Sequence, residues 1–248
     1  MPVYTADALI LRTYKLGEAD RIVVFLTRDR GKKRGVAKGA RRPRSRYVGA
    51  LEPMTRADVA YYEREQRELV RLNYVDTVRS PLSASTAEAL GHVGYFAELI
   101  DEWAPEAHAD ERLFRLGASM IDAVASGAAP EVLARYFEYW LLRLQGVYPG
   151  LACAGCGTVF ERGAGAVLGP REHVFACRAC APAGGTSLSP EAVGFLRAAG
   201  RIGPGAAGQL PLSAAAAREL ETAHRRLINL HLDKELKSAR ILREIAGR

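Results

Sequence analysis

The stretch RDRGKKRGVAKGARRPRSR, residues 28–46, concentrates the positive charge of this chain. It holds ten Lys or Arg residues and one acid, Asp29, a local balance of +9, whereas the whole chain of 248 residues carries +7. The rest of the chain therefore sums to about −2. A dense positive segment on an otherwise nearly neutral protein is the electrostatic signature of a nucleic-acid-binding surface.

A block of like charge is also typical of a solvated or disordered tail. Two features of the neighbouring sequence favour a folded setting instead. Apolar, β-rich segments lie on both sides of the block, and Gly31, Gly35 and Gly39 divide it as turn residues would. The pattern therefore predicts that the charge lies on strand edges and loops of a folded domain.

Five β-rich runs fill the first eighty residues of the chain. They are residues 3–12, 21–28, 32–38, 56–63 and 68–78. Five short strands at this spacing predict an OB-fold, a small five-stranded β-barrel, over residues 1–80. The connection from Gly39 to Glu52 then forms a long basic loop between the third and fourth strands.

Aromatic residues in or beside these strands provide a second signal for nucleic-acid binding. Aromatic side chains on a sheet can stack on the bases of a single strand without reading its sequence. Some of them must fill the barrel core, and Tyr61 and Tyr62 point to opposite faces of one strand, so at most one of that pair can stack on a base. The six candidates are Tyr14, Phe25, Tyr47, Tyr61, Tyr62 and Tyr74.

Beyond Pro81 the apolar residues repeat at helical spacing. Ser85 and Glu88 have the form of a capping box. The apolar stripe that follows consists of Leu90, Val93, Ala97, Ile100 and Trp103. Similar stripes recur over residues 113–124, 133–144 and 220–230. They predict an α-helical domain made of residues 81–150 and 183–248, so that the chain is an α+β multidomain protein.

Four cysteines form the most specific local pattern in the chain. Cys153, Cys156, Cys177 and Cys180 make two C-x-x-C motifs separated by twenty residues, the spacing with which four thiolates surround tetrahedral Zn²⁺. Four sulfur ligands leave no open coordination position, so we expect one structural Zn²⁺ per chain in a zinc-finger module, residues 151–182. The alternatives are four free thiols or a redox pair, although a redox pair is typical of a βαβ context that this segment lacks.

Other sequence patterns indicate a binding protein and not an enzyme. The glycines form neither a P-loop nor a dinucleotide-binding fingerprint, and the acidic residues are scattered. The cysteine pattern favours a reduced compartment. The N-terminus lacks an apolar run long enough for a signal peptide, and no segment approaches the ~20 apolar residues of a membrane span. We therefore expect a cytoplasmic protein, associated with the nucleoid through DNA.

The N-terminal part carries a series of distinctive motifs. They are TADALILR from Thr5, GEAD at 17–20, VVFLT at 23–27, Gly31, GVAKGARRPRSR at 35–46, Leu51 and Pro53. Together these motifs resemble the RecO family of DNA repair proteins. The resemblance continues through the helical middle, the four cysteines and KELKS at 234–238, so it spans essentially the whole chain. Its motifs are most specific in the first 55 residues.

The resemblance implies a DNA-binding recombination mediator with an N-terminal OB-fold, a helical domain and a zinc-finger insert. Such proteins bind single- and double-stranded DNA, anneal complementary strands and act with RecR to load RecA onto DNA coated by single-stranded DNA-binding protein. The DNA-contacting positions implied for this chain are Lys32, Lys33, Arg34, Lys38, Arg41, Arg42, Arg44 and Arg46.

Two other classes of protein are compatible with the charge and the cysteines. An RNA- or ribosome-associated zinc protein would use the same basic barrel, and a preference for structured RNA would identify it. A metal-dependent DNA-processing enzyme would need open metal sites, and cleavage of labelled DNA in Mg²⁺ or Mn²⁺ would identify it.

Overall fold

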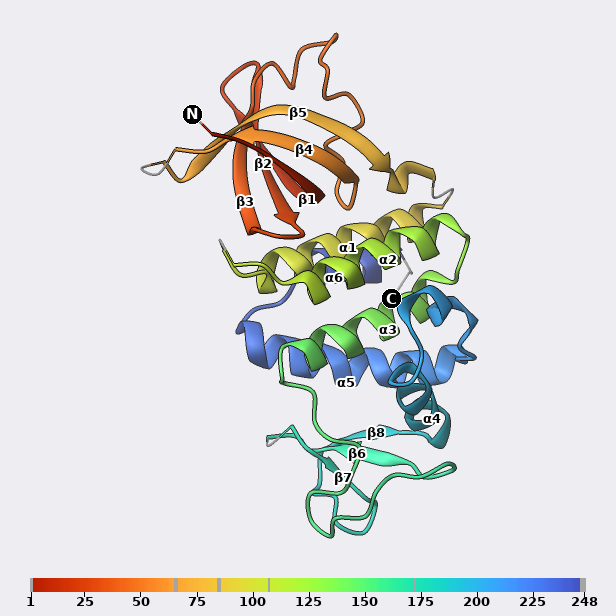
Figure 1. The fold of residues 1–248 in the computed structure, drawn as a ribbon. Coiled ribbons are helices and arrows are strands. Elements are labelled where there is room, and N and C mark those ends of the chain that lie inside the picture. The colour runs from red at the N-terminus through yellow and green to blue at the C-terminus, as the bar shows by residue number, and fades with distance from the viewer. Residues whose placement is uncertain (1, 65–66, 84–85, 107, 172, 246–248) are drawn as a thin grey trace. The chain divides into compact units, whose positions relative to one another are not determined.

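The computed structural model describes residues 2–64, 67–83, 86–106, 108–171 and 173–245 (Figure 1). The strands are β1 Val3–Leu16, β2 Asp20–Thr27, β3 Gly31–Ala37, β4 Arg56–Tyr62, β5 Leu69–Arg79, β6 Ala166–Leu168, β7 Phe175–Ala176 and β8 Thr186–Leu188. The helices are η1 Pro81–Ser83, α1 Ala87–Trp103, α2 Glu111–Ala125, α3 Pro130–Leu144, α4 Pro190–Ala199, η2 Pro204–Gln209, α5 Ala214–Leu232 and α6 Lys237–Ile245. Within these described ranges, no helix combines the length and the apolar character that crossing a bilayer requires.

The first five strands form a closed barrel in the order β1-β2-β3-β5-β4, which confirms the predicted OB-fold. Neighbouring strands are antiparallel except β3 and β5, which pair in parallel over three residues, from Arg34↔Leu69 to Val36↔Arg71. The first strand is longer than the sequence pattern predicts. Its polar end continues to Leu16 because it remains paired with β2, as far as Leu16↔Asp20.

The barrel interior accounts for three of the six aromatic candidates. Phe25, Tyr47 and Tyr61 are at most 2% exposed and belong to the barrel core. The rings of Phe25 and Tyr61 meet edge to face, with their centroids 5.7 Å apart. These three side chains therefore stabilise the barrel and are not available to stack on bases.

The chain packs as two compact units, each described by itself. One unit contains residues 1–127 and 236–248, and the other contains residues 128–235. In the first unit, α1 and α2 pack on β1 of the barrel, and α6 packs on α1. The three helices α1, α2 and α6 thus belong to the same unit as the barrel. The domain limits based on the sequence, 1–80, 81–150 with 183–248, and 151–182, stay a prediction.

The N-cap of helix α1 lies one residue after the cap that the sequence suggests. Ser85 lies outside the described residues, and the side chain of Thr86 accepts the hydrogen bond from the Ala89 backbone N–H at 3.1 Å. Val93, Ala97, Ile100 and Trp103 are buried as the apolar stripe predicts, and only Leu90 departs from it, with 41% of its surface exposed.

Helix α6 belongs to the first unit, where the Glu98 carboxylate binds its N-terminus. Glu98 on α1 accepts hydrogen bonds from the backbone N–H groups of Lys237 and Ser238, at 3.2 and 2.7 Å, and from the Ser238 hydroxyl at 2.5 Å. A carboxylate at a helix N-terminus satisfies N–H groups that have no partner within the helix. Glu98 therefore fixes the start of α6, and Gly91 leaves room for Leu242 of that helix.

The second unit combines α3, α4 and α5 with a small sheet of order β7-β6-β8. Its core contains a buried polar network. Glu138 accepts a hydrogen bond from His224 Nδ1 at 2.8 Å and pairs with Arg135 at 3.0 Å, while the Tyr148 hydroxyl donates to His224 Nε2 at 3.0 Å. Because the Glu138 carboxylate can only accept, Nδ1 of His224 carries a proton, and in the neutral ring Nε2 then accepts from Tyr148. Burial lowers the pKa of His224 and outweighs the Glu138 carboxylate, which acts in the opposite direction.

The start of β3 should tolerate no side chain at Gly31. Gly31 has φ +72°, and an added Cβ would fall within 3.0 Å of three backbone atoms of His108. We expect Gly31→Ala to lower the free energy of unfolding by about 2–4 kcal/mol, because a left-handed backbone and a steric clash combine. Urea denaturation measures the effect.

Gly39→Ala is the matched control. Gly39 has a similar φ of +70°, but an added Cβ would meet only side-chain atoms of Arg42, at 3.6 Å and beyond. This variant should lose only about 1 kcal/mol. Equal losses in the two variants would contradict the predicted clash with His108.

The buried histidine predicts a loss of stability in mild acid. Because the pKa of His224 is lower in the folded than in the unfolded chain, the unfolded chain binds the additional proton. The free energy of unfolding should therefore fall as the pH drops below about 6.5, the usual pKa of histidine. His224→Gln should flatten this dependence in denaturation curves between pH 7 and 5. An unchanged dependence in this variant would contradict the role of His224.

Candidate nucleic-acid interface and metal centre

Five of the eight predicted DNA-contacting side chains are exposed together at the end of β3 and on the following loop. They are Lys38, Arg41, Arg42, Arg44 and Arg46. Long cationic side chains on a loop can reach the phosphates of a nucleic acid and neutralise them. The structure therefore presents this part of the basic segment to solvent.

The loop that carries these cations is anchored to the barrel. Tyr47 is buried, and its hydroxyl donates to the Leu72 carbonyl of β5 at 3.2 Å. The Arg46 guanidinium lies 5.0 Å from the centre of the Tyr47 ring. Ala50 and Leu51 are buried in the barrel core as well. The cations thus project from a segment whose apolar residues fix its position.

The base of the loop is held by the turn between β1 and β2. Asp20 accepts a hydrogen bond from the Gly39 backbone N–H at 2.8 Å. The backbone N–H of Arg41 donates to the Ala19 carbonyl at 2.9 Å, and its guanidinium donates to the Gly17 carbonyl at 2.7 Å. These contacts hold the charged loop next to a second turn of the barrel.

The other three predicted side chains interact with acidic or carbonyl groups of the same unit. Lys32 donates to the Asp101 carbonyl at 2.6 Å and lies 3.6 Å from the Asp101 carboxylate. Lys33 pairs with Glu63 at 2.6 Å. The Lys32 and Lys33 side chains are only 10% and 15% exposed. Both contribute to the packing of β3 as well as to its charge.

Arg34 differs from the two lysines because it lies at the surface. Its guanidinium pairs with Glu106 at 3.1 Å, and 56% of the side chain is exposed. Exposed ion pairs of this kind contribute about 0–1 kcal/mol to stability. Arg34 can therefore exchange its partner for a phosphate at small energetic cost.

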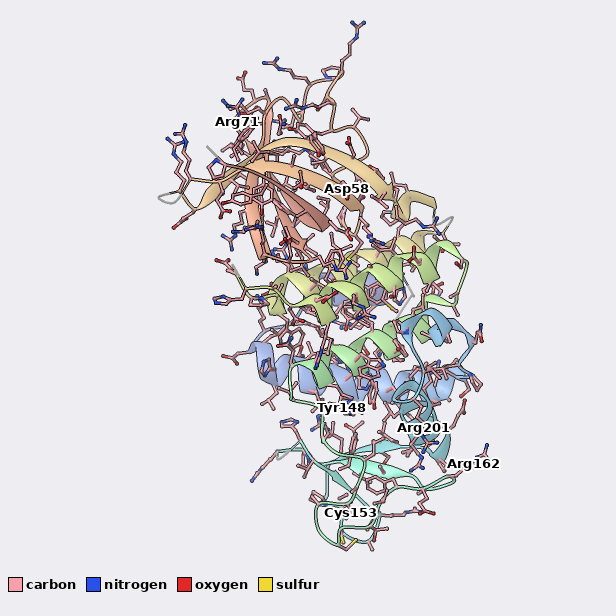
Figure 2. The ribbon with its side chains drawn as sticks, viewed as in Figure 1. Asp58, Arg71, Tyr148, Cys153, Arg162 and Arg201 are labelled. Carbon is pink, nitrogen blue, oxygen red and sulfur yellow. The ribbon has the colours of Figure 1, made fainter. Side chains whose placement is uncertain are left out.

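A second group of cations was missed by the sequence analysis. Arg64, Arg67 and Arg71 come from the β4–β5 connection and the start of β5, and they line one cavity together with Lys38. Figure 2 labels Arg71 on the barrel. Their wide spacing, interrupted by acidic residues, gives no charge block in the sequence. Only the pairing of β3 with β5 brings them beside Lys38.

Three aromatic candidates remain accessible on the barrel. Tyr14 is 46% exposed, whereas Tyr62 and Tyr74 are half-buried. Tyr62 also lines the cavity that contains Arg71. Tyr61 faces the barrel core. Its neighbour Tyr62 lies on the opposite face of the strand and therefore stays a candidate for base stacking.

The four cysteines converge as the sequence spacing predicts. Their sulfur atoms all lie within 4.8 Å of one another, and Figure 2 shows the sulfur near the labelled Cys153 at the tip of the module. Among the described residues, no other group of three or more His, Cys, Asp or Glu side chains brings its ligand atoms together in this way. His173 is not part of the cysteine cluster.

Two tight turns present the sulfurs to a common point. Within the first turn the Gly157 N–H donates to the Cys153 carbonyl at 2.8 Å, and within the second the Cys180 N–H donates to the Cys177 carbonyl at 3.0 Å. Gly157 adopts a left-handed φ of +74°. Gly155 leaves room for Cys180, whose sulfur would lie 3.3 Å from an added Cβ.

The electrostatics of the cluster suit a bound cation. Backbone N–H groups of Cys177 and Cys156 lower the pKa of Cys153 to about 6, which favours its thiolate. Hydrogen bonds to the sulfurs of Cys177, Cys156 and Cys153 raise the pKa of Cys180 to about 12, because they stabilise its protonated thiol. A divalent cation would replace the proton that these sulfurs share, so the donor set fits a tetrahedral metal ion.

Family models match both parts of the chain. The model described as "Recombination protein O N terminal" matches residues 1–81, and "Recombination protein O C terminal" matches residues 84–240. The chain belongs to the recombination protein O family. The N-terminal match of this family ends just after β5, and its C-terminal match includes the cysteine cluster.

Curated relatives of this recombination protein O family member carry the name "DNA repair protein RecO". The protein of Koribacter versatilis (strain Ellin345) is 42% identical over 161 residues, which cover 63% of this chain and 64% of that protein. The protein of Anaeromyxobacter sp. (strain K) is 36% identical over 251 residues, 96% of this chain and 94% of that protein. The protein of Geobacter sulfurreducens is 35% identical over 240 residues, 96% and 97% of the two chains.

The convergence of the sulfurs predicts one metal ion per chain in the purified protein. Cys153→Ser should lose most of the bound metal and lower the thermal unfolding temperature, because metal binding adds to the stability of the folded state. His173→Ala is the control and should retain the metal. Elemental analysis with thermal unfolding, with and without chelator, measures both. A metal-free wild-type protein whose stability does not respond to chelator would contradict the assignment.

Proposed function

We propose that this chain is a DNA-binding recombination mediator in DNA repair. It binds single- and double-stranded DNA, anneals complementary strands and, with RecR, helps to load RecA onto DNA coated by single-stranded DNA-binding protein. It does so in the cytoplasm, at the nucleoid, and catalyses no covalent reaction. The observation that carries the proposal is the group of five exposed cations on an anchored loop of the OB-fold in a recombination protein O family member.

Annealing follows from electrostatics in this proposal. Two DNA strands are polyanions, and their mutual repulsion falls when closely spaced cations replace part of the counterion atmosphere. The exposed cations lie on a loop and on a strand end, so they can contact phosphates without reading bases. Lys38, Arg41, Arg42, Arg44 and Arg46 make these direct contacts in the proposal.

The three remaining cations have a supporting role. Lys32 and Lys33 add to the positive field, but a phosphate reaches them only if the contacts to Asp101 and Glu63 loosen. Arg34 joins the direct contacts after it leaves Glu106. This order of involvement is supported by the exposure of the three side chains.

The metal in this proposal is one structural Zn²⁺ per chain. Cys153, Cys156, Cys177 and Cys180 hold it through four thiolates, and no position is left for substrate. The metal ties together the two tight turns that carry the cysteines. DNA binding by the barrel does not involve the metal in this proposal.

Salt dependence and annealing test the proposal together. Five phosphate contacts predict a slope of about −4.5 for log K against log salt on duplex DNA. The triple variant Arg41→Ala, Arg42→Ala, Arg44→Ala should reduce the magnitude of the slope by about 3. It should also slow the annealing of complementary strands coated with single-stranded DNA-binding protein, which the wild-type chain accelerates.

A matched control removes three exposed arginines of the second unit. The variant Arg162→Ala, Arg201→Ala, Arg218→Ala loses the same net charge but keeps the basic loop. It should retain the wild-type slope and annealing rate. A wild-type slope near −1, no acceleration of annealing, tighter binding to structured RNA than to DNA, or cleavage of DNA in Mg²⁺ would each contradict the proposal.

A further inference from the structure

The barrel carries a cavity of about 500 Å³ beside the basic loop, which we call the β3–β5 pocket. Its walls come from β3, from the end of β4 and from the start of β5, with Arg64, Arg67 and Glu68 of the β4–β5 connection at its rim. The volume lies within the range of about 300–1,000 Å³ that is typical of small-ligand sites. The pocket therefore has room for one nucleotide.

Strand register places an aromatic and a cationic side chain next to each other in this pocket. Tyr62 of β4 pairs with Arg71 of β5, and Arg71 pairs in parallel with Val36 of β3. Residues directly opposite each other on paired strands share one face of the sheet. Because Tyr61 and Leu72 belong to the barrel core, the three paired residues face outward.

The charge of the pocket is strongly positive. Four cationic side chains line it, Lys38, Arg64, Arg67 and Arg71, against one acid, Glu68. Within the described part of the chain, Lys38, Arg67 and Arg71 are exposed and form no ion pair. Lys32 and Lys33 differ because they contact Asp101 and Glu63, whereas none of the described acids forms an ion pair with these three side chains.

We propose that the β3–β5 pocket binds one unpaired nucleotide of a DNA single strand. Tyr62 stacks on the base, Lys38 and Arg71 contact the adjoining phosphates, and Arg67 contributes positive charge at the rim. Base stacking on an aromatic ring together with cations along the backbone is a general mode of single-strand binding. A base within a duplex would first have to leave its stack and its partner, which costs a few kcal/mol.

This inference rests on the proposed DNA-binding function and adds a subsite that distinguishes single strands from duplexes. The exposed loop from Arg41 to Arg46 contacts phosphates of either form, whereas the pocket requires an unpaired base. The proposal therefore assigns affinity and preference to different residues. Overall affinity for DNA depends on the loop, and the preference for single strands depends on Tyr62 and Arg71.

Equilibrium binding of the full-length chain tests the pocket. Fluorescence anisotropy would measure its affinity for labelled oligothymidylate and for a blunt duplex of equal length. Tyr62→Ala should weaken binding to oligothymidylate about tenfold but change binding to the duplex less than about twofold, since stacking contributes only to the unpaired strand. Tyr62→Phe keeps the ring and should bind both DNAs like the wild type.

Arg71→Gln and one control complete the comparison. Arg71→Gln should weaken oligothymidylate binding more than duplex binding. Arg112→Gln removes an exposed arginine of α2, outside the pocket. This control should leave the ratio of the two affinities unchanged.

Photo-cross-linking locates the base independently. An oligothymidylate with a single iododeoxyuridine should cross-link to the peptide that contains Tyr62, and mass spectrometry identifies the modified residue. Equal losses on both DNAs in Tyr62→Ala, or a cross-link outside the pocket, would overturn the inference while the proposed DNA-binding function stands. A wild-type chain that binds neither DNA would overturn both.

Discussion

Barrel closure depends on the short parallel pairing between β3 and β5. Only three residues of each strand pair there, and β3 contributes few apolar side chains of its own. Close packing compensates for the short ladder. At Gly35 an added Cβ would lie 2.9 Å from a Val70 methyl group, and at Gly31 it would collide with the backbone of His108. Glycine is required at both positions because neighbouring atoms occupy the space of a side chain.

The same closure explains how one strand can carry so many cations. Alternation along β3 sends Lys32 and Arg34 to one side of the barrel wall and Lys33 to the other. Each finds an acid or a carbonyl at a different place in the unit, with Asp101 and Glu63 serving the two lysines. These partners offset the repulsion between the cations of β3. The exposed cations lie on the loop that follows the strand.

The second unit is inserted between parts of the first. The chain leaves the first unit at Gly127 and returns at Leu236, where the Glu98 carboxylate receives the N-terminus of α6. Within the insertion, His224 and Glu138 form a buried polar network that includes Arg135 and Tyr148 of the same unit. Each unit therefore has its own core and its own polar contacts. The KELKS motif of residues 234–238 is the place where the chain passes from one to the other.

The sequence alone determined the barrel, the helical segments and the four cysteines that converge. Strand and helix periodicity are local, and two C-x-x-C motifs limit how four sulfurs can meet, so these features need no knowledge of distant contacts. The charge block likewise identified the basic loop, including Arg41 and Arg42. The start of α1 was not determined by the sequence, because Ser and Thr are both good cap residues, and the hydrogen bond from the Ala89 backbone N–H to the Thr86 side chain is a feature of the structure.

Only the tertiary structure decided which residues of those patterns are exposed. Phe25 and Tyr61 are aromatic residues on strands, as the stacking candidates had to be, yet barrel closure buries both. Arg71 belongs to no charge block, but the parallel register of β3 and β5 brings it beside Lys38 and Tyr62. Exposure and convergence depend on contacts between residues far apart in the chain, and a linear pattern does not contain them.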